Sequence, residues 1–431
     1  MNYFSTNKQS PVVDFKEAAI NGQAPDKGLY FPQAIPSFAN ELIRDIVDYP
    51  DTEIAFRVIQ PYVGDTIPAD ILFRIVNETI NFPLPLVKLK DDIFSLELFH
   101  GPTLAFKDVG ARFMSRCLGY FLRNSDKKVT ILVATSGDTG GAVANGFYEV
   151  EGVEVIILYP SGKVSPVQEK QLTTLGKNIH ALEIEGTFDD CQQLVKQAFT
   201  DADLNQRLFL TSANSINVAR WLPQQLYYFL AYKQWPYKDN PPVISVPSGN
   251  FGNICAGLLA WRSGLPVSHF IAACNANDVV TQYLQTEKWE VKDAIATLSN
   301  AMDVGNPSNF IRVLELFHHR FPELTGHLSS SSSTDKETSA TIRDIYQDYH
   351  YLLDPHGAVG CLALLRYLEL HPGRKGIFLE TAHPVKFPAA VEKITGQHIE
   401  IPPSVQQIMS AEKQSQRMPP DFDHLKQYLL H

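Results

Sequence analysis

Residues 129–147, VTILVATSGDTGGAVANGF, contain an apolar run, a glycine-rich turn and a second apolar segment in direct succession. The first run has the length of a buried strand, and the second has the small and apolar residues of a buried helix. Similar apolar runs, each followed by a turn or a helical pattern, return at residues 153–160, 179–186, 241–264, 268–278 and 375–384. This alternation is typical of βαβ units, so we expect an α/β protein with mostly parallel sheets.

These patterns fall into two blocks, which predicts two open, mostly parallel α/β layers. The first 95 residues differ, because short helical patterns such as residues 38–49 alternate there with Pro-rich joints. The Ser-rich residues 329–334 are predicted to form a mobile loop inside the second layer. We expect a small N-terminal unit over 1–95, a first α/β domain over 96–240, and a second α/β domain over 241–431. Part of residues 96–112 could belong to the larger domain instead.

The composition excludes several classes of protein. The chain of 431 residues has a formal net charge of -10 and no basic block to offset it, which disfavours binding to nucleic acid or to an anionic membrane. It has no secretory leader pattern and no apolar stretch of membrane-spanning length, so we expect a cytoplasmic protein. Its five cysteines are widely spaced without a C-x-x-C pair, which favours reduced core thiols over disulfides and gives no indication of a metal.

Two strand-to-helix turns have the composition of anion sites. Residues 248–253, SGNFGN, and residues 135–141, TSGDTGG, each follow an apolar strand pattern and precede a helical one. Glycines allow backbone N–H groups to point at one spot, and the helix adds the positive end of its dipole. Either could instead be an ordinary turn. As a pair at the carboxyl ends of two sheets, they predict a cleft for a ligand with two anionic ends. Neither matches the Walker A or the G-x-G-x-x-G pattern.

Lys107, in HGPTLAFKDVG (residues 100–110), precedes a helical pattern. A lysine there could be a solvated surface charge. The apolar residues around it and the helix start both favour the neutral amine, so we expect its pKa to be lowered; these residues are Phe99, Leu104, Phe106 and Phe113. Such an amine condenses with an aldehyde, as in the binding of pyridoxal 5′-phosphate (PLP), whose phosphate would suit a glycine-rich turn. Asp108 is interpreted as an acid that serves the helix dipole.

Six blocks in one order carry a family resemblance: HGPTLAFKD, ATSGDTGGAV, NSINVARWLPQ, SVPSGNFGN, TLSNAMDVGNPSN and TAHPVKFP. Together they resemble the threonine synthase family of fold-type II PLP enzymes, in the form with an N-terminal extension. The resemblance begins at KGLYFPQ (residues 27–33) and covers nearly the whole chain. It implies the fold of the tryptophan synthase β subunit, with PLP as the cofactor.

The resemblance implies roles for residues around the cofactor. Lys107 would form the Schiff base and then move protons, and Thr381 would meet the pyridine nitrogen. Asp138 would lie near the cofactor's 3′-oxygen, where an acid needs a donor or a proton. His383 is left unassigned, and without the resemblance it and Thr381 would be ordinary loop residues. The phosphate would be held by the turn Gly249, Asn250, Phe251, Gly252 and Asn253.

For the substrate, the resemblance implies that the loop Ser136, Gly137, Asp138 and Thr139 grips the α-carboxylate. We also expect Thr103 to be a substrate-binding residue. Candidates for the substrate phosphate are Lys163, Ser215, Asn217 and Arg220. The last three could equally form a helix cap and a surface arginine. Asn300, Asp303 and Asn306 either line the cleft or build a tight loop.

The implied reaction converts O-phospho-L-homoserine and water into L-threonine and phosphate, the last step of threonine biosynthesis. A related PLP-dependent phospho-lyase or hydroxy-amino-acid dehydratase, which would release a 2-oxo acid, remains an alternative. A non-catalytic protein that binds a phosphate ligand is a more distant one. The chain would act as a monomer or a homodimer.

Overall fold

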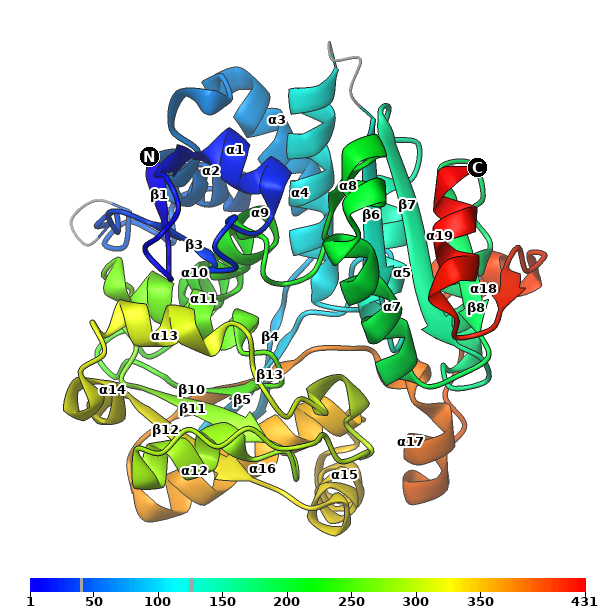
Figure 1. Ribbon diagram of the computed structural model, residues 1–431. Coiled ribbons are helices and arrows are strands. Elements are labelled where there is room, and N and C mark those ends of the chain that lie inside the picture. The colour runs from blue at the N-terminus through cyan, green and yellow to red at the C-terminus, as the bar shows by residue number, and fades with distance from the viewer. Residues whose placement is uncertain (39–41, 124–127) are drawn as a thin grey trace.

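In the computed structural model, residues 1–38, 42–123 and 128–431 are described. Their strands form three sheets: two mostly parallel sheets and a small antiparallel one near the N-terminus. The predicted fold class is therefore confirmed. Figure 1 shows the two larger sheets, with the N-terminal elements in blue beside helix α4. No helix within the described ranges has the length and apolarity needed to cross a membrane.

The first large sheet has six strands in the order β12-β11-β10-β13-β5-β4, and only β4 runs antiparallel to its neighbour. Its central strands are apolar and buried on both faces because helices cover them. Its strands are β4 (Leu86–Lys90), β5 (Ile93–Glu97), β10 (Val243–Pro247), β11 (His269–Cys274), β12 (Leu328–Ser332) and β13 (Gly376–Glu380). The helices of this part are α11 (Gly252–Arg262), α12 (Val279–Thr286), α13 (Phe310–Leu316), α14 (Phe321–His327), α15 (Asp335–Tyr349), α16 (Pro355–Leu370) and α17 (Pro388–Thr395), with the 3-10 turns η3 (Asn300–Met302) and η4 (Pro384–Lys386).

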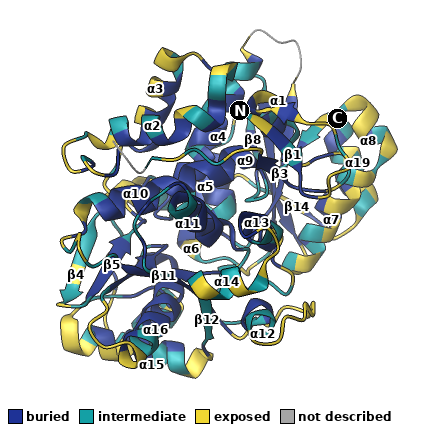
Figure 2. Cartoon of the chain, turned by 90° about the vertical axis from the view of Figure 1, so that its left-hand side faces the viewer, coloured by how far each residue is buried: buried dark blue, intermediate teal, exposed yellow. Residues whose placement is uncertain are grey.

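The second large sheet has five parallel strands in the order β14-β8-β7-β6-β9. Its strands are β6 (Val129–Ala134), β7 (Val153–Pro160), β8 (Ile179–Ile184), β9 (Phe209–Thr211) and β14 (Gln416–Met418). The helices of this part are α4 (Lys107–Leu122), α5 (Asp138–Phe147), α6 (Pro166–Thr173), α7 (Phe188–Thr200), α8 (Ala202–Arg207), α9 (Val218–Trp221), α18 (Pro403–Ser410) and α19 (Phe422–Leu430), with the turn η2 (Leu222–Gln224). Helix α10 (Gln225–Gln234) follows η2 and packs against α11 and α2. In Figure 2 the central helices α5 and α11 are dark blue, which places them inside the molecule.

The N-terminal unit is a three-stranded antiparallel sheet with helices packed on α4. Phe15 anchors it, since its ring lies 6.3 Å from that of Phe113 on α4. Its elements are β1 (Asn2–Ser5), β2 (Val13–Asp14), α1 (Phe15–Asn21), β3 (Tyr30–Pro32), α2 (Asp51–Val63), η1 (Gly64–Thr66) and α3 (Ala69–Thr79). Of the helical pattern expected at 38–49, residues 39–41 lie outside the described residues, and 42–48 form consecutive turns.

The sheets do not follow the expected domain boundaries in two places. Residues 86–97, from the N-terminal unit and the start of the first α/β domain as predicted, form β4 and β5 of the six-stranded sheet. Residues 416–418, from the end of the chain, pair with β8 in the other sheet. Both segments extend a large sheet at one of its edges. A sequence pattern does not reveal such pairing, because strand partners far apart in the chain leave no local signal.

The prediction of a mobile Ser-rich loop was wrong. Residues 328–332 form β12, the edge strand that pairs in parallel with β11. Ser330 Oγ donates to the carbonyl of Ala272 at 2.8 Å, and Thr281 shares a 2.7 Å hydrogen bond with the same hydroxyl. Serine is polar and has no strong strand preference, so backbone pairing with β11 and these hydroxyl bonds decide the structure here.

Candidate active site

Helix α4 begins at Lys107, and the loop before it is fastened to the loop after β13. Leu98 N donates to Glu380 O at 2.9 Å, and Phe106 N donates to Thr381 O at 2.9 Å. In the other direction, His383 N donates to Leu104 O at 3.0 Å. These bonds join the carboxyl edge of the six-stranded sheet to the first turn of α4. They therefore fix where Lys107 enters the space between the two large sheets.

Lys107 is half-buried, with its ammonium 5.6 Å from the centre of the Phe106 ring. Burial lowers the pKa of Lys107, and the positive charges of Lys386 and Arg220 add to this effect. Asp138 acts in the opposite direction on the same pKa. The lowered pKa that the sequence predicts agrees in direction and in main cause. A larger neutral fraction of this amine makes it a better nucleophile and proton acceptor.

Asp108 does not pair with Lys107 in this arrangement. Its carboxylate accepts hydrogen bonds from Thr103 N at 2.9 Å and from Thr103 Oγ1 at 2.5 Å. Asp108 is fully buried, and burial raises its pKa despite the bonds from Thr103. The Thr103 hydroxyl, a candidate substrate ligand, is thus used to hold the turn before Lys107.

The glycine-rich turn after β10 has the properties of a phosphate cradle. Among the described residues, no backbone carbonyl accepts from the N–H groups of residues 250–253, and helix α11 begins at Gly252. Phe251 has a φ of 62°, which turns the chain so that these groups lie at the helix start. A Cβ at Gly249 would lie 2.7 Å from Met302 Cα, so the turn packs directly under η3. Free donors at a helix N-terminus fit the PLP phosphate.

Side chains from other loops support this cradle. Asn250 Nδ2 donates to Ser215 Oγ at 2.7 Å, and Asn250 Oδ1 accepts from Ser308 N at 2.6 Å. Asn309 Nδ2 also donates to Ser215 Oγ, at 3.1 Å. Asn253 turns back, and its amide donates to Pro247 O at 2.7 Å. Asn250, Ser215 and Asn253 therefore shape the turn with their side chains, and the donors that remain for an anion are backbone groups.

The second glycine-rich turn lies between β6 and α5. Thr135 Oγ1 accepts from Gly137 N at 3.0 Å and from Gly140 N at 2.9 Å, which closes the turn. Gly137 has a φ of 140°, and a Cβ there would lie 2.5 Å from the Gln168 side chain. The hydroxyls of Ser136 and Thr139 are half-buried at the helix start. Hydroxyls and N–H groups in this position suit a carboxylate.

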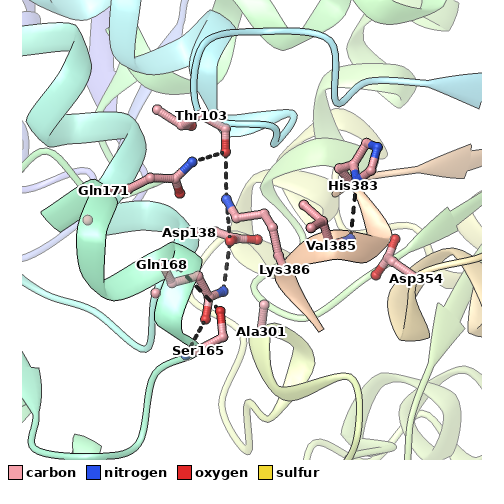
Figure 3. Close-up of polar contacts among 12 residues, drawn as sticks. Thr103, Asp138, Ser165, Gln168, Gln171, Ala301, Asp354, His383, Val385 and Lys386 are labelled. Atoms are coloured by element: carbon pink, nitrogen blue, oxygen red, sulfur yellow. Dashed lines mark hydrogen bonds and ion pairs between the residues drawn. The ribbon is translucent and has the colours of Figure 1, made fainter. Parts of the chain in front are cut away.

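Asp138, in the first turn of α5, is held from two sides (Figure 3). Lys386 Nζ lies 2.7 Å from Asp138 Oδ1, and Gln168 Nε2 donates to the same oxygen at 2.9 Å. Burial alone would raise the pKa of Asp138, but the charges of Lys386 and Lys107 outweigh it and hold that pKa well below its usual range. Asp138 is therefore an ionised carboxylate. An acid near the 3′-oxygen was expected to need a donor or a proton, and Lys386 is that donor.

The candidates for the substrate phosphate occupy different environments. Lys163 is exposed in the turn after β7, beside the strand that leads to Ser136. Asn217 is fully buried: it caps α9 through a 2.9 Å bond from Ala219 N and donates to Ala19 O at 2.8 Å. Arg220 is buried beneath α4, bonded to the Ala213 carbonyl, and burial lowers its pKa to about 10. Of the two charged candidates, Lys163 and Arg220, only Lys163 is exposed.

The loops after β13 and around η3 complete the site. Thr381 is buried beside Lys107, with its carbonyl bound to Phe106. His383 Nδ1 accepts from Val385 N at 3.1 Å, and burial, assisted by His100, lowers the pKa of His383 to about 4. Asp303 accepts from Asn275, Asn277 and Thr297, which builds a tight loop. Asn300 is half-buried in η3, and Asn306 is exposed.

Sequence reasoning missed three residues of this site: Lys386, Gln168 and Gln171. Gln171 Nε2 donates to Thr103 O at 3.0 Å, beside Lys386 Nζ, which donates to the same carbonyl at 2.7 Å. Lys386 had a usable signal, since it stands between Val385 and Phe387 in the TAHPVKF block. The two glutamines had none, because their role depends on α6 packing against the first turn of α5.

A lysine of lowered pKa at a helix start and a turn with free backbone donors are features expected of an enzyme that uses PLP. A family model described as "Pyridoxal-phosphate dependent enzyme" matches residues 79–379, which shows this class. Models described as "Threonine synthase N terminus" and "Threonine synthase, C-terminal" match residues 2–80 and 357–429. The chain belongs to the threonine synthase family of PLP-dependent enzymes.

Three relatives illustrate the match. The threonine synthase of Haemophilus influenzae is 45% identical over 431 residues, which cover 100% of both chains. The crystal structure of the Escherichia coli enzyme has a TM-score of 0.92 and 44% identity, covering 100% of this chain and 99% of that one. The structure of the PLP-bound enzyme from Brucella melitensis has a TM-score of 0.94 and 37% identity, covering 100% of this chain and 98% of that one.

Proposed function

We propose that this chain converts O-phospho-L-homoserine and water into L-threonine and phosphate, with PLP held at Lys107. The observation that supports it most directly is the full-length match to threonine synthases, at 45% identity in the Haemophilus influenzae relative. The site geometry agrees with it, because a half-buried lysine lies near Asp138 in one glycine-rich turn, and the other turn keeps the backbone N–H groups of residues 250–253 free for an anion. A substrate with a carboxylate and a phosphate, used with a phosphorylated cofactor, needs such donors.

Backbone N–H groups of residues 250–253 would hold the PLP phosphate, Thr381 would face the ring nitrogen, and Asp138 the 3′-oxygen. When bound, PLP supplies an electron sink that makes the α-proton and β-proton of the substrate removable. Lys107 Nζ accepts and returns these protons, which its lowered pKa favours. Because the pyridine partner is a hydroxyl and not a carboxylate, the ring nitrogen is not forced into its protonated form.

The turn from Ser136 to Thr139 would bind the substrate α-carboxylate through its N–H groups and hydroxyls. The departing phosphate requires a cation or further donors. Lys163 is our candidate, since it is exposed at the carboxyl edge of the same sheet, whereas the side chains of Asn217 and Arg220 serve the fold around α9. Ser215 would support the site of the PLP phosphate, because its hydroxyl accepts a hydrogen bond from Asn250 in the glycine-rich turn.

The function is tested by incubating the PLP-loaded chain with O-phospho-L-homoserine and measuring phosphate, threonine and 2-oxobutyrate. We expect phosphate and threonine in equal amounts and no turnover by Lys107→Ala. Accumulation of 2-oxobutyrate in place of threonine would instead identify the related lyase or dehydratase activity. A protein that binds no PLP and releases no phosphate would contradict both.

The role of Lys163 is tested separately. Lys163→Met should lower kcat/KM by roughly tenfold or more, because a charge-assisted contact to phosphate is lost, while the absorption of bound PLP stays unchanged. Lys393→Met, at an exposed position on α17, is the control and should keep wild-type kinetics. Equal kinetics of both variants would exclude Lys163 as a phosphate ligand.

A further inference from the structure

Lys386 is the most deeply buried cation of the site. Its side chain is 0% exposed, and its ammonium lies 2.7 Å from Asp138 Oδ1 and 2.7 Å from Thr103 O. Gln168 and Gln171 of α6 donate to the same two oxygens, at 2.9 and 3.0 Å. Figure 3 shows this network, in which the loop after β13 reaches the turn before Lys107 and the first turn of α5.

The network joins the two large sheets at their carboxyl edges. Lys386 follows β13 of the six-stranded sheet, whereas Asp138 follows β6 of the five-stranded sheet. Because this ion pair has so little solvent contact, removing one partner leaves a buried charge without compensation, which is strongly unfavourable. Gln168 donates to the same oxygen of Asp138, and Gln171 donates to the same carbonyl of Thr103, so two neutral donors reinforce this arrangement.

We propose that Lys386 is a positioning residue of the PLP site, which holds Asp138 as an oriented carboxylate and fixes the Thr103 turn through which Lys107 is placed. This inference rests on the proposed position of PLP at Lys107. It extends the proposed function by naming Lys386 as the cation that compensates the negative charge of Asp138. Without this cation, the 3′-oxygen of PLP would repel a carboxylate in this position.

The pair also controls the charge near Lys107. The carboxylate of Asp138 raises the pKa of Lys107, and the ammonium of Lys386 lowers it. Removal of Lys386 alone leaves the negative charge of Asp138, which favours the protonated form of Lys107 Nζ. Removal of the Asp138 charge alone leaves the positive charge of Lys386, which disfavours that form. The two single substitutions should therefore shift the pKa of Lys107 in opposite directions, and the double substitution should largely cancel these shifts.

The test uses the full-length PLP-loaded protein without substrate and follows visible absorption against pH. The midpoint of this titration is the pH at which half of the Lys107 nitrogen is protonated. Relative to wild type, we expect the midpoint to rise by about one pH unit or more in Lys386→Met and to fall in Asp138→Asn. In the double variant it should lie between those of the single variants. PLP affinity should drop roughly tenfold in Lys386→Met and recover partly in the double variant. Lys393→Met is the charge-matched control and should keep the wild-type midpoint.

A purely structural role would change stability and affinity but would not move the midpoint in opposite directions. The inference is therefore overturned if both single variants shift the midpoint the same way, or if neither shifts it. If Lys386→Met does not fold, Asp138→Asn and the double variant decide the question, since the second substitution must raise the midpoint again. Because no substrate is present, a failure here is distinct from a failure of the proposed reaction, which the threonine assay reports.

Discussion

Asn250 and Ser215 are joined by a 2.7 Å hydrogen bond from the Asn250 amide to the Ser215 hydroxyl, which connects the phosphate cradle to the segment before α9. Asn309 donates to the same hydroxyl. Ser215→Ala leaves both amides without this acceptor, but only the bond from Asn250 supports the cradle directly, so we expect PLP affinity to fall roughly fivefold, as for one lost hydrogen bond. Titration of the PLP-free protein with PLP measures it. Ser410→Ala, in α18, should bind PLP as wild type does, and equal affinity of both variants would contradict the role of Ser215.

Gly249 has no room for a side chain. A Cβ there would meet Met302 Cα at 2.7 Å and Ala301 O at 2.8 Å, and both are backbone atoms that cannot rotate away. Gly249→Ala should therefore displace the cradle from η3 and weaken PLP binding by roughly tenfold or more. Gly326→Ala is the matched control, because nothing lies within 4 Å of its added Cβ. Tight PLP binding by Gly249→Ala, seen in the same absorbance titration, would show that η3 moves freely.

The sequence alone was sufficient for the parts of the site that depend on local pattern. The glycine turns at 135–141 and 248–253 and the position of Lys107 at a helix start follow from a strand pattern, a break and a helix pattern within a few residues. The α/β class follows from the same repetition. In each case the residues that make the structure are neighbours in the chain, so the signal is contained in a short window.

What could not be predicted depends on partners far apart in the chain. Lys386 and Asp138 are 248 positions apart, as their numbers show, and only the packing of two sheets brings them together. Asn217 resembled a phosphate ligand, but its amide contacts α1 through Ala19 O. The edge strand β14 joins β8 from the other end of the chain. Backbone and amide groups pair with many partners equally well, so composition does not identify the partner chosen.

Arg312 links the N-terminal unit to the active-site loops. Its buried guanidinium donates to Tyr30 O at 3.0 Å, to Ile216 O at 2.6 Å and to Asn309 Oδ1 at 2.8 Å. Arg312→Met should lower the free energy of unfolding by about 3–5 kcal/mol, because these acceptors lose their donors. Urea unfolding of the PLP-free chain measures the loss. Exposed Arg343→Met should change it by no more than about 0.5 kcal/mol. A similar midpoint for both variants would rule out Arg312 as a link.

His383 should make the protein sensitive to acid. Burial lowers its pKa from 6.5 to about 4, so between these values the unfolded chain binds a proton that the folded chain does not. Stability from this group is therefore complete above pH 6.5 and is lost as the pH falls towards 4. His383→Asn can still accept from Val385 N but does not titrate, so it should lose about 2 kcal/mol less between pH 7 and 4.5. Urea unfolding at the two pH values measures the difference, with exposed His398→Asn as the control. An acid-induced loss in His383→Asn equal to that of the wild type would mean that His383 is protonated in the folded protein and that its imidazole is not shielded by Phe99 and the η4 turn.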